Sequence, residues 1–148
     1  MATAEATEFI RCPVTTAFEL ISRPESHPLW QGDLESDGII AGDGGAGSRG
    51  REARRYMGRV VVTEYEVTEC HEPDLWAFRT VSGPISMSGS VTCAPAESGT
   101  QVRIEISFAG WYGEAMARLA KRQFQGHLRS LKDLIEVGGQ AIRPAVAG

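Results

Sequence analysis

Most of the chain has the pattern of half-buried β-strands. From residue 34 to residue 110, short apolar runs are separated by turn-forming sequences, for example Met57 and Gly58. This pattern predicts six strands, at residues 35–41, 48–56, 60–70, 75–82, 85–94 and 101–109. Because the connections between them are short, consecutive strands should pair as an antiparallel meander.

The alternation in the last two of these strands identifies the buried face of the sheet. One face carries Ile85, Met87, Gly89, Val91, Val102, Ile104, Ile106 and Phe108. The other face carries serines together with Arg103 and Glu105. A sheet with one apolar face needs a cover on that side, so we expect this face to lie against a helix.

Residues 113–137 have the 3.6-residue period of an amphipathic helix. The apolar stripe consists of Met116, Leu119, Ala120, Phe124, Leu128, Leu131, Leu134 and Ile135. We expect Gly138 and Gly139 to end this helix and residues 138–148 to form a loose tail. The stripe is long enough to cover the apolar face of the sheet.

The N-terminal region predicts one more strand and two short helices. Residues 3–11 form the first strand, and Pro13 begins a helix at residues 14–22. Residues 23–33 contain two prolines and predict a broken helix or turn, with Trp30 exposed as part of a clasp. The whole is an α+β fold in one domain, residues 1–148 with a core at about 7–137: a seven-stranded antiparallel sheet curved around a long C-terminal helix, with two short helices between strands 1 and 2.

Composition and charge exclude several classes of function. The 148 residues carry a net charge of −4 without a basic patch, so nucleic acid is not an expected partner. The chain has neither a signal-peptide pattern nor an apolar run long enough for a transmembrane segment. Three widely spaced cysteines indicate reduced thiols, and we expect a cytoplasmic protein. Only Lys121 and Lys132 among the 15 basic residues are lysines, as in proteins encoded by GC-rich genomes.

Several short motifs add to this pattern. They are Pro13 before a helix bearing Phe18, Pro28-Leu29-Trp30, residues 44–51 (GGAGSRGR), Val67-Thr68-Glu69 before Pro73, Leu75-Trp76-Ala77-Phe78, and Gly99-Thr100. Over about residues 7–137 the chain resembles the START-like (SRPBCC) superfamily, in particular its polyketide cyclase/dehydrase and lipid-transport family of bacterial proteins. The resemblance implies a helix-grip fold with a hydrophobic ligand cavity between sheet and long helix, and no set of catalytic residues.

The turn at Met57 and Gly58 fixes the register of one hairpin. It pairs Tyr56 with Arg59, Arg54 with Val61, Glu52 with Thr63 and Gly50 with Tyr65. On the outer face Arg51 then lies opposite Glu64 and Arg49 opposite Glu66, as two cross-strand ion pairs. Glu52, Arg54, Tyr56, Thr63 and Tyr65 point inward.

An inward charge requires an explanation. A lone charge in a dry core would cost several kcal/mol, so Glu52 and Arg54 should pair with each other, be solvated at a cavity mouth or bind a ligand. A twisted, wet rim of the sheet is the alternative. If Arg54 faces a ligand, it favours a carboxylate or enolate oxygen, and therefore a ligand with an apolar body and an oxygen-bearing end.

Gln123 and His127 interrupt the apolar stripe of the long helix one turn apart. His127 is either a core histidine bonded to a sheet backbone group or a buried water, or a polar contact at the cavity wall. The candidate ligand-binding residues are Trp30, Glu52, Arg54, Tyr56, Tyr65, Trp76, Phe78, Met87, Phe108, Trp111, Met116, Gln123 and His127.

Two functions remain open at this point. The first is binding or transport of a small, mostly apolar ligand, lipid- or polyketide-like. The second is a polyketide cyclase/dehydrase-type enzyme, with His127, Tyr65, Glu52 and Arg54 as candidate acids and bases. We expect no cofactor. We also expect no metal, because residues 69–72 (ECHE) alternate between strand faces and no second cluster of ligands stands at a zinc-like spacing. The sequence is compatible with a homodimer and does not determine the oligomeric state.

Overall fold

The computed structural model describes residues 2–147, with side chains described as far as residue 138. The strands are β1 (Ala2–Ile10), β2 (Leu34–Ala41), β3 (Arg49–Tyr56), β4 (Arg59–His71), β5 (Leu75–Ser82), β6 (Met87–Ala96) and β7 (Gly99–Phe108). The helices are α1 (Val14–Ser22), the 3₁₀ helix η1 (Pro24–Leu29) and α2 (Gly113–Ala147). The predicted α+β architecture is confirmed, with each strand boundary within two residues of its predicted position.

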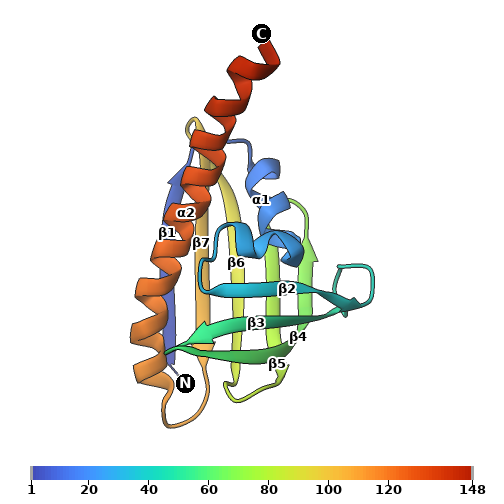
Figure 1. Ribbon diagram of the computed structural model, residues 1–148, viewed down its shortest axis with the longest axis vertical. Helices are drawn as coiled ribbons and strands as arrows, with labels where there is room; N and C mark the ends of the chain where they lie inside the picture. Colours follow the sequence, from blue (N-terminus) through green and yellow to red (C-terminus); the bar gives the residue numbers. More distant parts are fainter. Residues whose placement is uncertain (1, 148) are drawn as a thin grey trace.

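The seven strands form one antiparallel sheet in the order β1-β7-β6-β5-β4-β3-β2. The sheet is strongly curved, so that β2 and β3 run across the direction of β6 and β7 (Figure 1). Helix α2 packs on β1 and β7, while α1 and η1 connect β1 to β2 (Figure 1). The curved sheet and these helices enclose the interior.

The predicted apolar face of the sheet is buried. Val102, Ile104, Ile106 and Phe108 are each at most 2% exposed, and Leu128 and Leu131 of α2 are fully buried. Trp30, which we expected to be exposed, is only 2% exposed and belongs to the core. The two prolines of η1 turn the chain back toward the sheet, which carries this indole inward.

The predicted end of the long helix is wrong. Helical backbone continues through Gly138 and Gly139 to Ala147. Glycine in a helix costs about 1 kcal/mol relative to alanine but keeps its backbone hydrogen bond, so it weakens a helix without ending it. The side chains of residues 139–148, where we expected a loose tail, lie outside the described part of the structure. Among the described residues, no helix is both long and apolar enough to cross a membrane.

The predicted register of the β3–β4 hairpin is confirmed at every pair, from Arg49 opposite Glu66 to Tyr56 opposite Arg59. Arg51 and Glu64 form the expected ion pair at 2.9 Å. The second expected pair is wrong, because Glu66 binds Arg79 of β5 at 2.7 Å instead. Glu66 has a neighbouring strand on each side, and Arg79 stands directly opposite it on β5.

Candidate functional site

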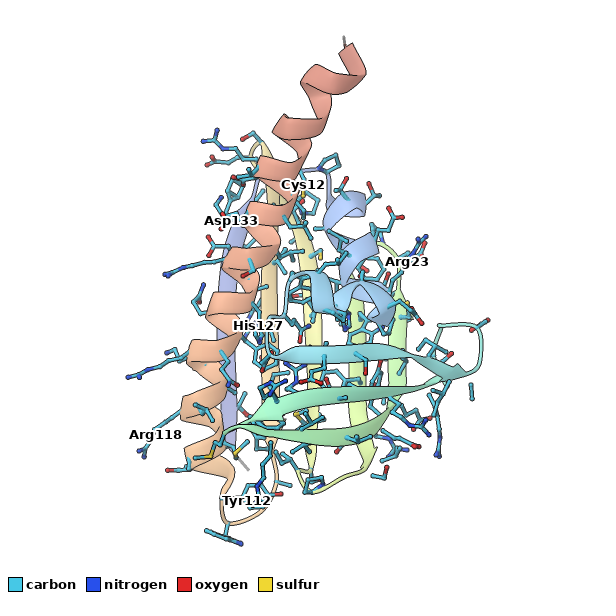
Figure 2. The ribbon with its side chains drawn as sticks, in the orientation of Figure 1. Cys12, Arg23, Tyr112, Arg118, His127 and Asp133 are labelled. Carbon is cyan, nitrogen blue, oxygen red and sulfur yellow. The ribbon has the colours of Figure 1, made fainter. Side chains whose placement is uncertain are left out.

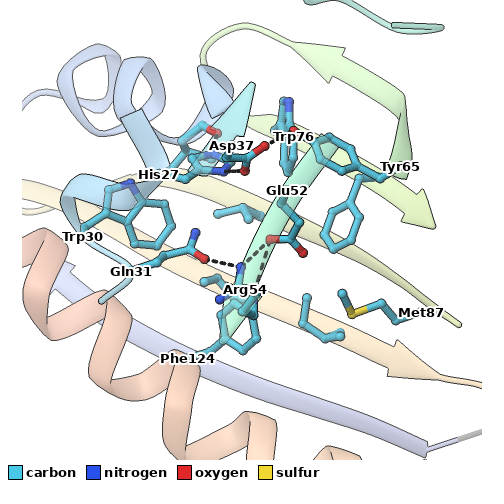
Figure 3. Close-up of a pocket in the computed structure, with 15 residues that line it drawn as sticks. His27, Trp30, Gln31, Asp37, Glu52, Arg54, Tyr65, Trp76, Met87 and Phe124 are labelled. Atoms are coloured by element: carbon cyan, nitrogen blue, oxygen red, sulfur yellow. Dashed lines mark hydrogen bonds and ion pairs between the residues drawn. The ribbon is translucent and has the colours of Figure 1, made fainter. Parts of the chain in front are cut away.

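A cavity of about 50 Å³ lies between the concave face of the sheet, the α1–η1 segment and α2 (Figure 3). This central cavity is lined by Ile21, His27, Trp30, Gln31, Asp37, Glu52, Arg54, Tyr65, Trp76, Phe78, Met87, Val91, Ile104, Ile106 and Phe124. A side cavity of about 10 Å³ lies toward the start of α2. Arg54, Met87 and Phe124 line both cavities and form the partition between them.

The candidate ligand-binding residues fall into three groups. The central cavity is lined by Trp30, Glu52, Arg54, Tyr65, Trp76, Phe78 and Met87. The side cavity is lined by Tyr56, Phe108, Met116 and Gln123, together with Arg54 and Met87, which line both cavities. Trp111 and His127 line neither cavity. Trp111 is 96% exposed because it sits in the loop between β7 and α2, beyond the covered part of the sheet.

Arg54 extends from β3 into the interior, where Glu52 and Gln31 bind its guanidinium (Figure 3). Nη2 donates to Oε2 of Glu52 at 2.8 Å and to Oε1 of Gln31 at 2.6 Å, and Nε donates to the same Glu52 oxygen at 3.2 Å. Nη1 donates to Oδ1 of Asp33 at 2.8 Å. These bonds occupy four of the five N–H groups of a guanidinium. Arg54 is therefore paired with Glu52, the first of the three arrangements expected for an inward charge, and one N–H remains for another partner.

The charges of this cluster lie away from solvent. Glu52 and Arg54 are each 7% exposed, so the wet-rim alternative is wrong and the two residues pair with each other. Burial raises the pKa of Glu52, although Arg54 acts in the opposite direction. For Arg54, burial is outweighed by Glu52 and Asp33, which raise its pKa and keep it charged. Burial raises the pKa of Tyr56 to about 12.

His127 is held against the same cluster. Its Nε2 lies 3.1 Å from Oδ1 of Asp33, close enough for an ionic contact but outside the alignment of a hydrogen bond. Burial alone would raise the pKa of Asp33, but His127 and Arg54 outweigh it and the pKa is lowered. His127 thus contacts a carboxylate from the loop before β2. The imidazole ring of His127 packs edge-on against the Phe124 ring, with the ring centroids 5.2 Å apart. A sheet backbone group, the partner we considered first, does not fill this role.

A second buried polar chain, which the sequence did not predict, joins Tyr65, Asp37 and His27 (Figure 3). The Tyr65 hydroxyl donates to Oδ1 of Asp37 at 2.6 Å, and Nδ1 of His27 lies 3.0 Å from Oδ2. Nε2 of His27 is 2.7 Å from the Ile21 carbonyl, which only accepts, so Nε2 carries a hydrogen. Nδ1 and the Asp37 carboxylate therefore share one proton. Burial, reinforced by the Asp37 carboxylate, raises the pKa of Tyr65.

One signal could have indicated where Tyr65 lies. Gly50 stands opposite Tyr65 in the predicted register, and a Cβ at Gly50 would collide with the Tyr65 ring. The glycine therefore lets the ring lie flat across β3, with its hydroxyl reaching toward Asp37 of β2. Side chains from the strands and from α2 meet in the interior of the curved sheet (Figure 2).

Solved structures share this fold. A START superfamily protein from Mycobacterium smegmatis has a TM-score of 0.79 at 15% identity, covering 90% of this chain and 97% of that one. The di-domain ARO/CYC BexL from the BE-7585A biosynthetic pathway has a TM-score of 0.75 at 18% identity, covering 92% and 47%. Ginseng major latex-like protein 151 from Panax ginseng has a TM-score of 0.73 at 17% identity, covering 88% and 95%. At these identities the likeness establishes the helix-grip fold alone.

No curated protein matches the chain. A family match is nevertheless extensive: the family described as polyketide cyclase / dehydrase and lipid transport matches residues 1–136, which include all seven strands and most of the long helix. With the curved sheet and the covering helix, this match assigns the protein to the polyketide cyclase/dehydrase and lipid-transport family.

Proposed function

We propose that the protein binds a small, mostly apolar molecule in the central cavity. The observation that carries this proposal is the buried pair of Glu52 and Arg54 in an otherwise largely apolar and aromatic wall. Apolar residues of similar volume are often at least as stabilising as a buried ion pair, so stability alone does not account for the pair. An apolar cavity with a few convergent polar groups and shifted pKa values is the usual form of a ligand site.

The size of the cavity limits how a ligand enters. Ligand pockets for drug-sized molecules measure roughly 300–1,000 Å³, whereas the central cavity measures about 50 Å³. A lipid- or polyketide-like ligand therefore has to displace wall side chains. Met87 and Phe124 are the apolar members of the partition, and methionine adapts its shape easily. Their rotation would join the central and side cavities along α2.

The test uses N-phenyl-1-naphthylamine, a neutral polycyclic probe whose fluorescence rises in apolar surroundings. We expect a saturable rise with the wild-type protein. Val91→Phe should abolish it by filling the cavity, since Val91 lines the wall. Val62→Phe is the matched control, because Val62 is 53% exposed on the outer face of β4. Thermal melts check that both variants fold, and a wild type without saturable binding would refute the proposal.

An enzyme acting on a ligand in the same cavity is the second candidate. It is favoured by the hydrogen-bonded chain of Tyr65, Asp37 and His27, which all line the central cavity and in which Asp37 and His27 share a proton. Among the four candidate acids and bases, Glu52 and Tyr65 line the central cavity with hydrogen-bonding capacity left, while Arg54 is already bound and His127 lines neither cavity. Loss of turnover of a poly-β-ketone substrate in Tyr65→Phe, with probe binding retained, would support this candidate.

A further inference from the structure

From the polar groups of the central cavity we infer that the ligand carries an ammonium group, bound by the free carboxylate oxygen of Glu52. This inference rests on the proposed function and specifies the ligand class. Both hydrogen bonds from Arg54 to Glu52 use Oε2. The other oxygen of Glu52 points away from Arg54, into the space between Tyr65 and Met87 (Figure 3). The strongest polar group that the wall leaves to a ligand is therefore an acceptor.

The donors around the cavity do not offset this acceptor. Arg54 keeps one free N–H of five, and its charge is already shared by Glu52 and Asp33. The indole nitrogens of Trp30 and Trp76 are covered by protein atoms and do not reach the cavity. The Gln31 amide, whose oxygen accepts from Arg54, offers only neutral N–H groups. An anionic ligand would thus meet the free Glu52 oxygen without a free cation to bind it.

The charge balance of the interior points the same way. Two carboxylates, from Asp33 and Glu52, bind one permanent cation, Arg54, whereas Asp37 shares a proton with His27 and adds no net charge. Away from water such charges interact strongly. A cationic ligand reduces the excess negative charge, whereas an anionic ligand increases it.

Aromatic rings complete the site. Tyr65, Trp76 and Phe78 form one group, with ring centroids 5.5 to 6.3 Å apart, in the wall of the cavity that Glu52 also lines. Phe124 closes the opposite side and already lies under the Arg54 guanidinium, at 5.9 Å. Aromatic faces attract ammonium groups and also bind their alkyl substituents. The same walls therefore suit both the charged head and the apolar body of an amine.

The experiment compares three six-carbon ligands with different head groups: hexylammonium, hexanol and hexanoate. Each displaces N-phenyl-1-naphthylamine from the wild-type protein at pH 7. We expect hexylammonium to bind at least about tenfold more tightly than hexanoate, with hexanol between them. Hexanoate binding most tightly, or three equal affinities, would overturn the ammonium inference while leaving the proposed function intact. Absence of binding by the probe itself would instead refute the proposed function.

Two variants locate the effect at Glu52. Glu52→Gln should bring hexylammonium to within about threefold of hexanol, and the matched control Glu64→Gln, on the outer face of the same hairpin, should keep the wild-type preference. If Glu52→Gln does not fold, Glu52→Asp replaces it, with the charge kept but moved back from the cavity, and the ammonium preference should shrink. An unchanged preference in a folded Glu52 variant would refute the assignment to this residue.

Discussion

The two faces of the β3–β4 hairpin carry the same chemistry in opposite surroundings. On the outer face Arg51 binds Glu64 at 2.9 Å, with the arginine side chain 54% exposed. On the inner face Arg54 binds Glu52 at 2.8 Å, with each side chain 8% exposed. Nearly equal distances therefore accompany very different environments. The outer pair competes with water and salt, whereas the inner pair depends on its neighbours for solvation.

Removing the inner cation should have the largest effect. Arg54→Met leaves Glu52 and Asp33 buried without their shared partner, and we expect unfolding to become easier by roughly 3–5 kcal/mol. Urea unfolding followed by circular dichroism measures the change. A loss below about 1 kcal/mol would place the inner pair in the same class as the outer one.

Removing one hydroxyl from the second buried chain should have an intermediate effect. Tyr65→Phe deletes the donor to Asp37, and a hydrogen bond to a charged group contributes about 1.5–3 kcal/mol. The same urea assay measures it, with Tyr112→Phe as a control, since the Tyr112 hydroxyl only accepts a 3.3 Å bond from the Ser86 backbone at the surface. Equal losses in both variants would mean that the buried carboxylate does not strengthen the bond.

Acid should weaken the inner cluster through Asp33. The pKa of Asp33 is lowered in the folded protein. Ionised Asp33 therefore contributes to the free energy of unfolding above its ordinary pKa of 3.8, and this contribution is lost as the pH falls through the lowered pKa. The stability difference between wild type and Asp33→Asn should therefore be constant above about pH 5 and shrink below pH 4. Urea unfolding at pH 3 and pH 6 tests this, and a difference that grows on acidification would contradict it.

The outer pair should give the smallest effect. Arg51→Gln is expected to change the free energy of unfolding by less than about 1 kcal/mol, with most of that change absent in 0.5 M NaCl. The effect of Arg54→Met should depend little on salt, because its partners are buried. A strong salt dependence of the inner variant would remove the contrast between the two faces.

The hairpin also shows which parts of the site a sequence can reveal. The two-residue turn and the two-residue period of a strand together fix which side chains point inward, so the direction of Glu52, Arg54 and Tyr65 follows from local pattern. The partners of these residues could not be predicted in this way. Gln31 and Asp33 come from the segment before β2, and nothing in a local pattern states that they bind an arginine 21 to 23 residues later.

Asp37 and His27 were missed for a related reason. A register shift between Leu34 and Ser36 of β2 changes which face the following residues take, so simple alternation does not identify Asp37 as inward. His27 lies in a short 3₁₀ helix between two prolines, where no periodic pattern indicates direction. The fold could be predicted because it depends on repeated patterns, whereas much of the site depends on irregular segments.

The pairing of β1 with β7 has a consequence for synthesis on the ribosome. Ala2 lies opposite Phe108, so β1 pairs with a strand, residues 99–108, that is made roughly 100 residues later. At about 5–20 residues per second, the ribosome needs roughly 5–20 s to make that partner. Until then the N-terminal strand is an unpaired edge, open to other strands or to chaperones. The sheet can close only after β7 has been made, and α2, which covers β1, follows β7 in the chain.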